Sequence, residues 1–214
     1  MRRQVFRSDR IKVTENLLRN LHVQKVLELG AGDYSFEYIK KSKEVQWIKV
    51  DLLGECNVKC DLGSEKVLLP FVDETFDLVI CTEVVEHMLW PQQILRETYR
   101  VLVPYGSMLI SVPNITSLSY RIGWLLGHLP SCAASGNLPA QLDSLAYERE
   151  GGSILGGHVI DFNMKRLLRL LEFSGFVVSR MKGSGVIWYK QILPHWCLPP
   201  SFASNIICLA RKMR

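Results

Sequence analysis

Short apolar runs and amphipathic segments alternate along this chain of 214 residues. The apolar runs have the length of buried strands, about four to eight residues. Segments with apolar residues three and four positions apart predict helices that bury one face. The predicted strands span residues 25–29, 45–50, 76–81, 107–112, 176–180 and 205–210. The predicted helices span residues 8–21, 34–41 and 91–102, and a further helix is capped by Asn163 and ended by Gly175.

This alternation predicts an α/β fold with a doubly wound, mostly parallel sheet. A proline-rich turn at 194–200 returns the chain as a hairpin, so we expect an antiparallel last strand. Only a few residues separate Leu52 from Val58, whereas a parallel crossover needs roughly a dozen. The helix after the second strand is therefore expected to be short or missing. Clusters of Gly, Ser, Pro and Ala at 115–157 predict an inserted lid region within a single domain of residues 1–214.

Residues 26–33, Val-Leu-Glu-Leu-Gly-Ala-Gly-Asp, end the first predicted strand in a glycine turn. Gly30 and Gly32 lack a Cβ, so the turn can adopt positive φ and a ligand can approach the main chain closely. Glu28 lies near the carboxyl end of the strand, where ligands bind in open α/β sheets. Dinucleotide-binding proteins use a similar turn, but their fingerprint places a third Gly or Ala where this chain has Ser35. A Gly-x-Gly turn alone is a weak signal.

With the acid two residues before the first glycine, the turn resembles the Glu/Asp-x-Gly-x-Gly motif of class I S-adenosylmethionine (SAM)-dependent methyltransferases. Residues 76–87, from Phe76-Asp77 to Glu86-His87, resemble the Phe-Asp…Glu-His signature of the small-molecule members. Residues 97–106 resemble their Glu-x-x-Arg-Val-Leu-Lys-Pro-Gly-Gly segment, with departures at Val103 and Tyr105. The resemblance covers roughly residues 25–114 and 158–181, with the motifs in the expected order. It implies a Rossmann-like methyltransferase fold and SAM as the cofactor.

Asp51 ends the second predicted strand, 21 residues after Gly30. A carboxylate there can accept hydrogen bonds from both ribose hydroxyls of an adenosine, because it offers two oxygens. The alternative is a surface aspartate that only ends a strand. Asp61 and Leu62 resemble the pair that contacts adenine in this superfamily, and a turn aspartate is the competing interpretation. The cofactor-binding residues that the resemblance implies are Glu28, Gly30, Ala31, Gly32, Asp51, Leu52, Asp61, Leu62, Thr82 and Glu83.

Two histidines are the candidate catalytic residues. Methyl transfer from a sulfonium needs mainly binding and alignment, but an oxygen or nitrogen nucleophile can also need a base. The imidazole of histidine ordinarily titrates near neutral pH, which suits a general base, and His87 and His158 lie near predicted strand ends. The alternatives are structural: His87 could help to start a helix together with Glu83 and Glu86, and His158 could anchor a loop. The resemblance places Glu83 near the methionine moiety or the substrate rather than in the role of base.

An apolar stripe at 116–129 predicts one more helix. It could be a lid over an apolar or sugar-like acceptor, or a helix at a membrane interface. The pattern favours a helix packed on the core or against a second copy. Arg121 is the only basic residue within it, which is little for a membrane surface.

Composition narrows the classes of partner. The net charge of +5 comes from 26 basic and 21 acidic residues, and much of the excess lies at the two ends, so it does not favour a nucleic-acid groove. We expect no transmembrane span, because no apolar stretch reaches about 18 residues. Six scattered cysteines without metal-ligand spacing indicate free thiols, no metal site and a cytoplasmic location.

The leading hypothesis is therefore a SAM-dependent methyltransferase that acts on an oxygen or nitrogen nucleophile of a small-molecule, saccharide or lipid-linked acceptor. A non-catalytic module that binds SAM or a partner on the same fold is the alternative, since a cofactor site does not prove turnover. A nicotinamide-dependent oxidoreductase is disfavoured by Ser35 and by the later motifs. The identity of the acceptor and the oligomeric state do not follow from the sequence.

Overall fold

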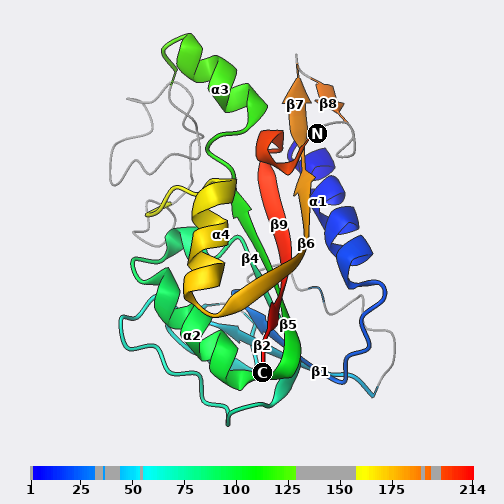
Figure 1. The fold of residues 1–214 in the computed structure, drawn as a ribbon, viewed down its shortest axis with the longest axis vertical. Helices are drawn as coiled ribbons and strands as arrows, with labels where there is room; N and C mark the ends of the chain where they lie inside the picture. Colours follow the sequence, from blue (N-terminus) through cyan, green and yellow to red (C-terminus); the bar gives the residue numbers. More distant parts are fainter. Residues whose placement is uncertain are drawn as a thin grey trace.

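A seven-stranded sheet forms the centre of the molecule (Figure 1). The computed structural model describes residues 2–31, 36, 44–53, 55–128, 158–188, 191–193 and 199–214. The strands lie in the order β3-β2-β1-β4-β5-β9-β6. Their bounds are β1 Lys25–Leu29, β2 Gln46–Asp51, β3 Val58–Lys59, β4 Phe76–Thr82, β5 Leu102–Pro113, β6 Phe176–Ser184 and β9 Asn205–Lys212. A separate hairpin pairs β7, Val186–Trp188, with β8, Gln191–Leu193.

The first five strands are parallel, and β9 runs antiparallel to both of its neighbours, β5 and β6. This arrangement confirms the predicted fold class, a mostly parallel α/β sheet whose last strand reverses. No helix separates β2 from β3 in the residues described there, so the expected loss of that helix is confirmed. The helix predicted at 34–41 lies outside the described residues.

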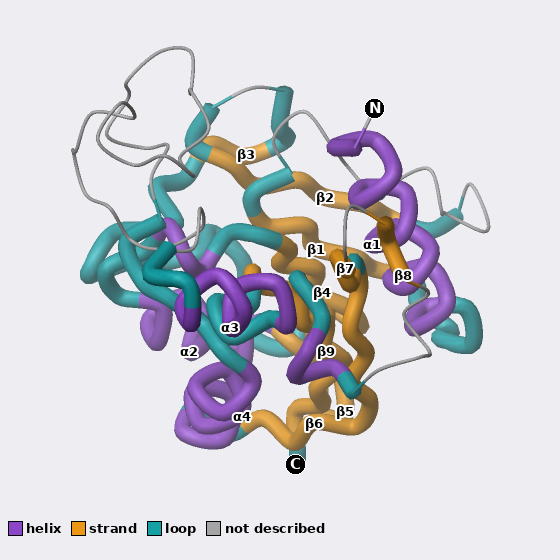
Figure 2. The backbone as a smooth tube through the Cα atoms, turned by 90° about the horizontal axis from the view of Figure 1, so that it is seen from above, coloured by secondary structure: helices purple, strands orange, loops and turns teal. Residues whose placement is uncertain are grey.

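Helices cover both faces of the sheet (Figure 2). The helix α1, Arg2–Leu18, places Val13 and Leu17 in the same buried cluster as Ile80 of β4. On the other face, α2, Pro91–Val101, and α4, Met164–Phe173, contribute to a second buried cluster that includes the neighbouring residue Val79. Adjacent strand residues point to opposite faces, so one apolar run serves both layers. No helix among the described residues is long and apolar enough to cross a membrane.

Several local predictions need correction. The strand predicted at 107–112 begins earlier, at Leu102, and passes through the expected turn, where Tyr105 has a φ of +63°. The pairing register with β4 shifts there to absorb the irregular residues. The helix predicted at 116–129 is shorter, α3, Leu118–Leu125. The favoured alternative, that it packs in the core, is wrong, because none of its residues is buried and Leu125 is 86% exposed.

The start of α4 follows its sequence signal. The Asn163 side chain accepts a hydrogen bond from the backbone N–H of Arg166 at 2.8 Å, which satisfies one of the free donors at the helix start. Gly175 ends the helical segment with a φ of +86°, and a Cβ there would lie 3.0 Å from the Tyr99 ring. Asn163 thereby fixes where the segment at 158–162 enters the helix, and Gly175 fixes where the helical segment ends.

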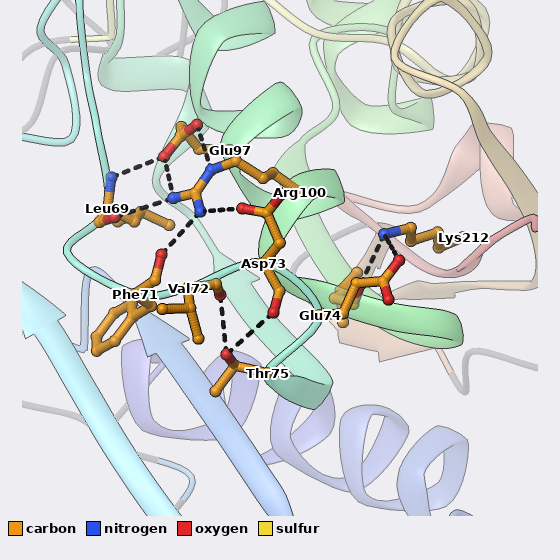
Figure 3. A network of polar contacts seen from close by, with 10 residues as sticks. Leu69, Phe71, Val72, Asp73, Glu74, Thr75, Glu97, Arg100 and Lys212 are labelled. Carbon is orange, nitrogen blue, oxygen red and sulfur yellow. Dashed lines mark hydrogen bonds and ion pairs between the residues drawn. The ribbon is translucent and has the colours of Figure 1, made fainter.

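A guanidinium fixes the loop that leads into β4 (Figure 3). Arg100 of α2 donates two hydrogen bonds to Glu97, one to Asp73, and one each to the carbonyl oxygens of Leu69 and Phe71. Burial would raise the pKa of Glu97, but its hydrogen bonds to Arg100 and Leu69 outweigh that effect and lower the pKa. The Glu-x-x-Arg segment of the sequence is thus a structural clamp at the amino end of β4.

Replacing Arg100 by Ala removes all five of these hydrogen bonds. We expect the free energy of unfolding to fall by about 3 kcal/mol, because Glu97 also loses its charged partner in a partly buried position. Urea denaturation followed by circular dichroism measures the change. Arg96→Ala, an exposed position of the same helix, is the control and should change stability by less than about 0.5 kcal/mol. Equal urea midpoints for the two variants would contradict the assigned role.

Candidate functional site

The candidate residues gather at the carboxyl edge of the sheet. β1 lies between β2 and β4, so the ends of these three strands are adjacent. Gly30 follows β1, Asp51 ends β2 and Thr82 ends β4. From β1 the chain builds the sheet to one side, through β2 and β3, and then crosses to the other side, to β4 and β5. Open α/β sheets bind ligands at the point where the strand order reverses in this way.

Glu28 is buried beneath the glycine turn, with 2% of its surface exposed. Its Oε1 accepts a hydrogen bond from the backbone N–H of Phe36, and its Oε2 accepts one from the Trp47 indole, both at 2.8 Å. The carboxylate therefore connects β1, the segment after the turn and β2. A buried carboxylate needs such partners to offset its lost hydration. The interaction with the Trp47 indole was not foreseen, because nothing in the sequence pairs positions 28 and 47 before the strand register is known.

Gly30 makes the closest approach in the turn. Its φ is +65°, and a Cβ built there would lie 2.4 Å from the Cγ2 of Val84, in the segment after β4. Its N–H donates to the carbonyl oxygen of Val50 in β2. The turn is thus wedged between the ends of β2 and β4, and only glycine fits. Ala31 is buried, and Gly32 lies outside the described residues.

Asp51 and Asp61 each organise a turn beside this edge. The Oδ1 atom of Asp51 accepts hydrogen bonds from the backbone N–H groups of Leu52 and Leu53, at 2.7 and 3.2 Å. The Oδ1 atom of Asp61 accepts one from Gly63 at 3.0 Å. Leu62 is buried, whereas Leu52 is 38% exposed. Both carboxylates lie on the side of β1 that is opposite to β4.

Glu83 follows β4 in a left-handed conformation, with a φ of +58°. Its carboxylate accepts hydrogen bonds from the Ser111 hydroxyl at 2.8 Å and the Asn205 amide at 2.9 Å, and forms an ion pair with Arg10 at 3.0 Å. These partners come from β5, β9 and α1, so Glu83 joins three elements at the site. Sequence reasoning missed Arg10 and Asn205, because only the sheet order brings such distant segments together.

Both candidate catalytic histidines lie on one side of the edge, with their ring centroids 5.0 Å apart in an edge-to-face arrangement. His87 ends the short 3₁₀ helix η2, Val85–His87, and His158 lies in the segment before α4. The two segments are joined because the carbonyl oxygen of Glu86 accepts hydrogen bonds from Val159 and Ile160, at 2.8 and 3.1 Å. Residues 71 positions apart in the sequence are thus placed side by side.

Glu86 lies beside both histidines and was not among the predicted site residues. It is 1% exposed, and its Oε1 is 3.8 Å from the Nε2 of His87. Burial, followed by the charge of Glu83, raises its pKa well above the usual value of a glutamate. One carboxylate oxygen and one ring nitrogen from each histidine lie within 4.8 Å of one another, so the three side chains could also hold a divalent cation. The Glu-His motif in the sequence pointed to this position, but only the structure shows that Glu86 is buried.

Comparisons with known proteins agree with this architecture. A sequence profile of the methyltransferase-domain family, Methyltransf_11, matches residues 14–110. A SAM-dependent methyltransferase from Thermotoga maritima, described as a possible histamine N-methyltransferase, has the same fold with a TM-score of 0.57 at 15% identity, over 98% of this chain and 92% of that one. A SAM-dependent methyltransferase from Archaeoglobus fulgidus superposes with a TM-score of 0.59 at 18% identity, over 94% of both chains. The methyltransferase-domain match thus covers a little under half of the chain, and the solved SAM-dependent methyltransferases share the fold of nearly all of it.

Curated relatives match the chain over shorter stretches. The ubiquinone biosynthesis O-methyltransferase of Rickettsia akari is 26% identical over 135 residues, which cover 56% of this chain and 54% of that protein. The mitochondrial enzyme of Bos taurus is 44% identical over 50 residues, 23% of this chain and 14% of its own length. The chain therefore spans about half, or less, of the length of these relatives. The match to the methyltransferase-domain family at residues 14–110 and the shared fold support the predicted superfamily and, with it, SAM as the cofactor.

The wedge at Gly30 generates a prediction. Gly30→Ala should lower the free energy of unfolding by more than 2 kcal/mol, roughly 1–2 kcal/mol from the left-handed backbone and the remainder from the clash with Val84. Gly127→Ala is a matched control, because Gly127 has a φ of +79° but nothing within 4 Å of its Cβ position. The double variant with Val84→Ala should recover part of the loss at Gly30. Equal effects at the two glycines, measured by urea denaturation, would show that Val84 does not press on the turn.

Proposed function

We propose that this protein transfers a methyl group from SAM to an oxygen or nitrogen nucleophile of a small-molecule, saccharide or lipid-linked acceptor. The wedged glycine turn supports the proposal, because Gly30 contacts Val84 and is hydrogen-bonded to Val50, which holds the turn at the carboxyl ends of the strands, where open α/β sheets bind ligands. The adenosine would lie there, with its ribose on Asp51 and its adenine near Asp61 and Leu62. The sulfonium would then face the end of β4, at Thr82 and Glu83.

The cofactor supplies the electrophile, and the chain would bind, align and exclude water. His158 and His87, whose rings are 5.0 Å apart, would face the acceptor in this arrangement, and an imidazole there can take the proton that the nucleophile loses. The region at 115–157, which includes α3, is the candidate for acceptor selection. The relatives that are named ubiquinone biosynthesis O-methyltransferases support an oxygen nucleophile.

A binding module without methyl transfer is the second candidate. One solved structure with this fold is described as a [4+2]-cyclase, with a TM-score of 0.59 at 15% identity over 96% of this chain and 80% of that one. The fold alone therefore does not define the reaction. Release of S-adenosylhomocysteine (SAH) in a panel of acceptors separates the two candidates, because only methyl transfer requires an acceptor.

Asp51→Asn tests the cofactor site. The amide keeps an oxygen for the turn that Leu52 and Leu53 form, but it loses the negative charge and an acceptor for a ribose hydroxyl. We expect SAM affinity, measured by titration calorimetry, to fall by more than tenfold, about 1.4 kcal/mol. Glu55→Gln, at a nearby exposed acid, should leave the affinity unchanged. Unchanged affinity in Asp51→Asn would remove this residue from the site.

His158→Ala tests the base. With an acceptor that supports SAH release, kcat should fall by about 10²-fold or more while the Kd for SAM stays the same, because only proton transfer is lost. The control is His22→Ala, at an exposed histidine of the α1–β1 connection. If kcat for His158→Ala equals that of the control, His158 is a structural residue.

A further inference from the structure

Three side chains with metal-binding groups meet just beyond the carboxyl end of β4. Glu86 offers a carboxylate oxygen, His87 and His158 each offer a ring nitrogen, and these three atoms all lie within 4.8 Å of one another. A point between them is at most about 2.8 Å from each atom, whereas such groups bind Zn²⁺ at about 2.0–2.2 Å. Shifts of less than about 1 Å therefore close the three groups around an ion. Because these bonds are shorter than hydrogen bonds to water, the ion needs no cavity of water size.

The carboxylate of Glu86 gives a second, independent indication of a ligand. The residue is 1% exposed, and neither carboxylate oxygen has a hydrogen-bond partner among the residues that the structure describes. The Nε2 atom of His87 is 3.8 Å from Oε1, which is too far for a hydrogen bond. The neighbouring carboxylate of Glu83 differs, because Arg10, Ser111 and Asn205 all bind it. Buried carboxylates in folded proteins are normally paired, hydrogen-bonded or bound to a metal.

The backbone holds the three groups together without an ion. The carbonyl oxygen of Glu86 accepts hydrogen bonds from the N–H groups of Val159 and Ile160, so the segment that carries His158 is fixed beside η2. Within η2, the N–H of His87 donates to the carbonyl oxygen of Val84 at 3.1 Å. Both histidines are partly exposed, so rotation of their side chains can supply the remaining approach. Solvent on their exposed side can complete the coordination of an ion.

We propose that Glu86, His87 and His158 form a binding site for one divalent transition-metal ion, of which Zn²⁺ is the example used here. Two imidazoles with one carboxylate suit Zn²⁺, Fe²⁺ or Ni²⁺, whereas Mg²⁺ and Ca²⁺ prefer oxygen ligands throughout. Three protein ligands with one position open to water are typical of catalytic rather than structural zinc sites. The spacing of the cysteines gave no sign of this site, because its ligands are histidines 71 positions apart and a glutamate.

Metal binding changes what the two histidines can do. A ligated neutral imidazole has one nitrogen on the metal and a proton on the other, so it has no lone pair left to take a proton. His158 can therefore act as a base only in protein that holds no metal at this site. The metal site goes beyond the proposed methyl transfer and does not depend on it, since the three ligands come together whether or not a cofactor is bound.

Titration calorimetry tests the site on the full chain after treatment with a chelator. Zinc chloride and magnesium chloride are the two probes. We expect one Zn²⁺ per chain, with a Kd at least a hundredfold lower than that for Mg²⁺, because two of the three ligands are imidazoles. The absence of Zn²⁺ binding, or equal affinities for the two ions, would overturn the proposal.

Variants assign the bound ion to these ligands. Glu86→Gln keeps the shape of the side chain but removes the charge, and His158→Ala removes one nitrogen, so each should weaken Zn²⁺ binding by at least tenfold. Glu65→Gln and His22→Ala change an exposed acid and an exposed histidine, and both should bind Zn²⁺ as the unaltered chain does. Should Glu86→Gln fail to fold, His158→Ala decides, because that side chain is partly exposed. Affinity that both site variants retain would overturn the assignment.

The spectrum of bound Co²⁺ identifies the ligand atoms in the unaltered chain. We expect the visible d–d bands of Co²⁺ with nitrogen and oxygen ligands, without a thiolate charge-transfer band. A thiolate band would place the ion on cysteines and overturn the proposal. Calorimetry with SAM reports on the proposed function separately. If SAM binds and Zn²⁺ does not, only the metal site fails; if Zn²⁺ binds and SAM does not, only the proposed function fails.

Discussion

The buried carboxylate of Glu28 is the constraint on which the carboxyl edge of this sheet depends. Its two oxygens hold the Phe36 backbone and the Trp47 indole, so one side chain sets the positions of β1, β2 and the segment after the glycine turn. Gly30 then brings the turn against Val84, which adds the end of β4 to the same unit. The superfamily resemblance implied that Glu28 binds the cofactor, whereas the structure gives its hydrogen bonds to the protein. Its influence on a bound cofactor would act through the shape of the turn.

Polar groups are distributed unequally between the two ends of β4. At the amino end, Arg100 donates hydrogen bonds to Glu97, to Asp73 and to two backbone carbonyl oxygens of the loop. At the carboxyl end, Glu86 is buried without a hydrogen-bond partner among the described residues. Stable clamps at one end allow a less stable arrangement at the other, because folding depends on the sum of these contributions. Sites that bind ligands commonly keep such unpaired groups at a cost in stability.

The sequence predicted the parts of this structure that depend on local pattern. The bounds of β1 and the cap at Asn163 agree with prediction, because apolar runs and capping residues act over a few positions. The continuous strand through Tyr105 was missed, since its pairing with β4 compensates for residues that locally favour a turn. α3 was wrongly placed in the core, because a helical apolar stripe shows amphipathicity but not what covers it. Glu83 was singled out from its motif as a candidate site residue, while its partners Arg10 and Asn205 required the three-dimensional fold.

Charge balance connects the proposed reaction with the two histidines. Transfer of a methyl cation from SAM converts a sulfonium into a neutral thioether, and a hydroxyl acceptor must also release a proton. An imidazole at position 158 would take that proton as the positive charge beside it disappears, so the local net charge stays constant.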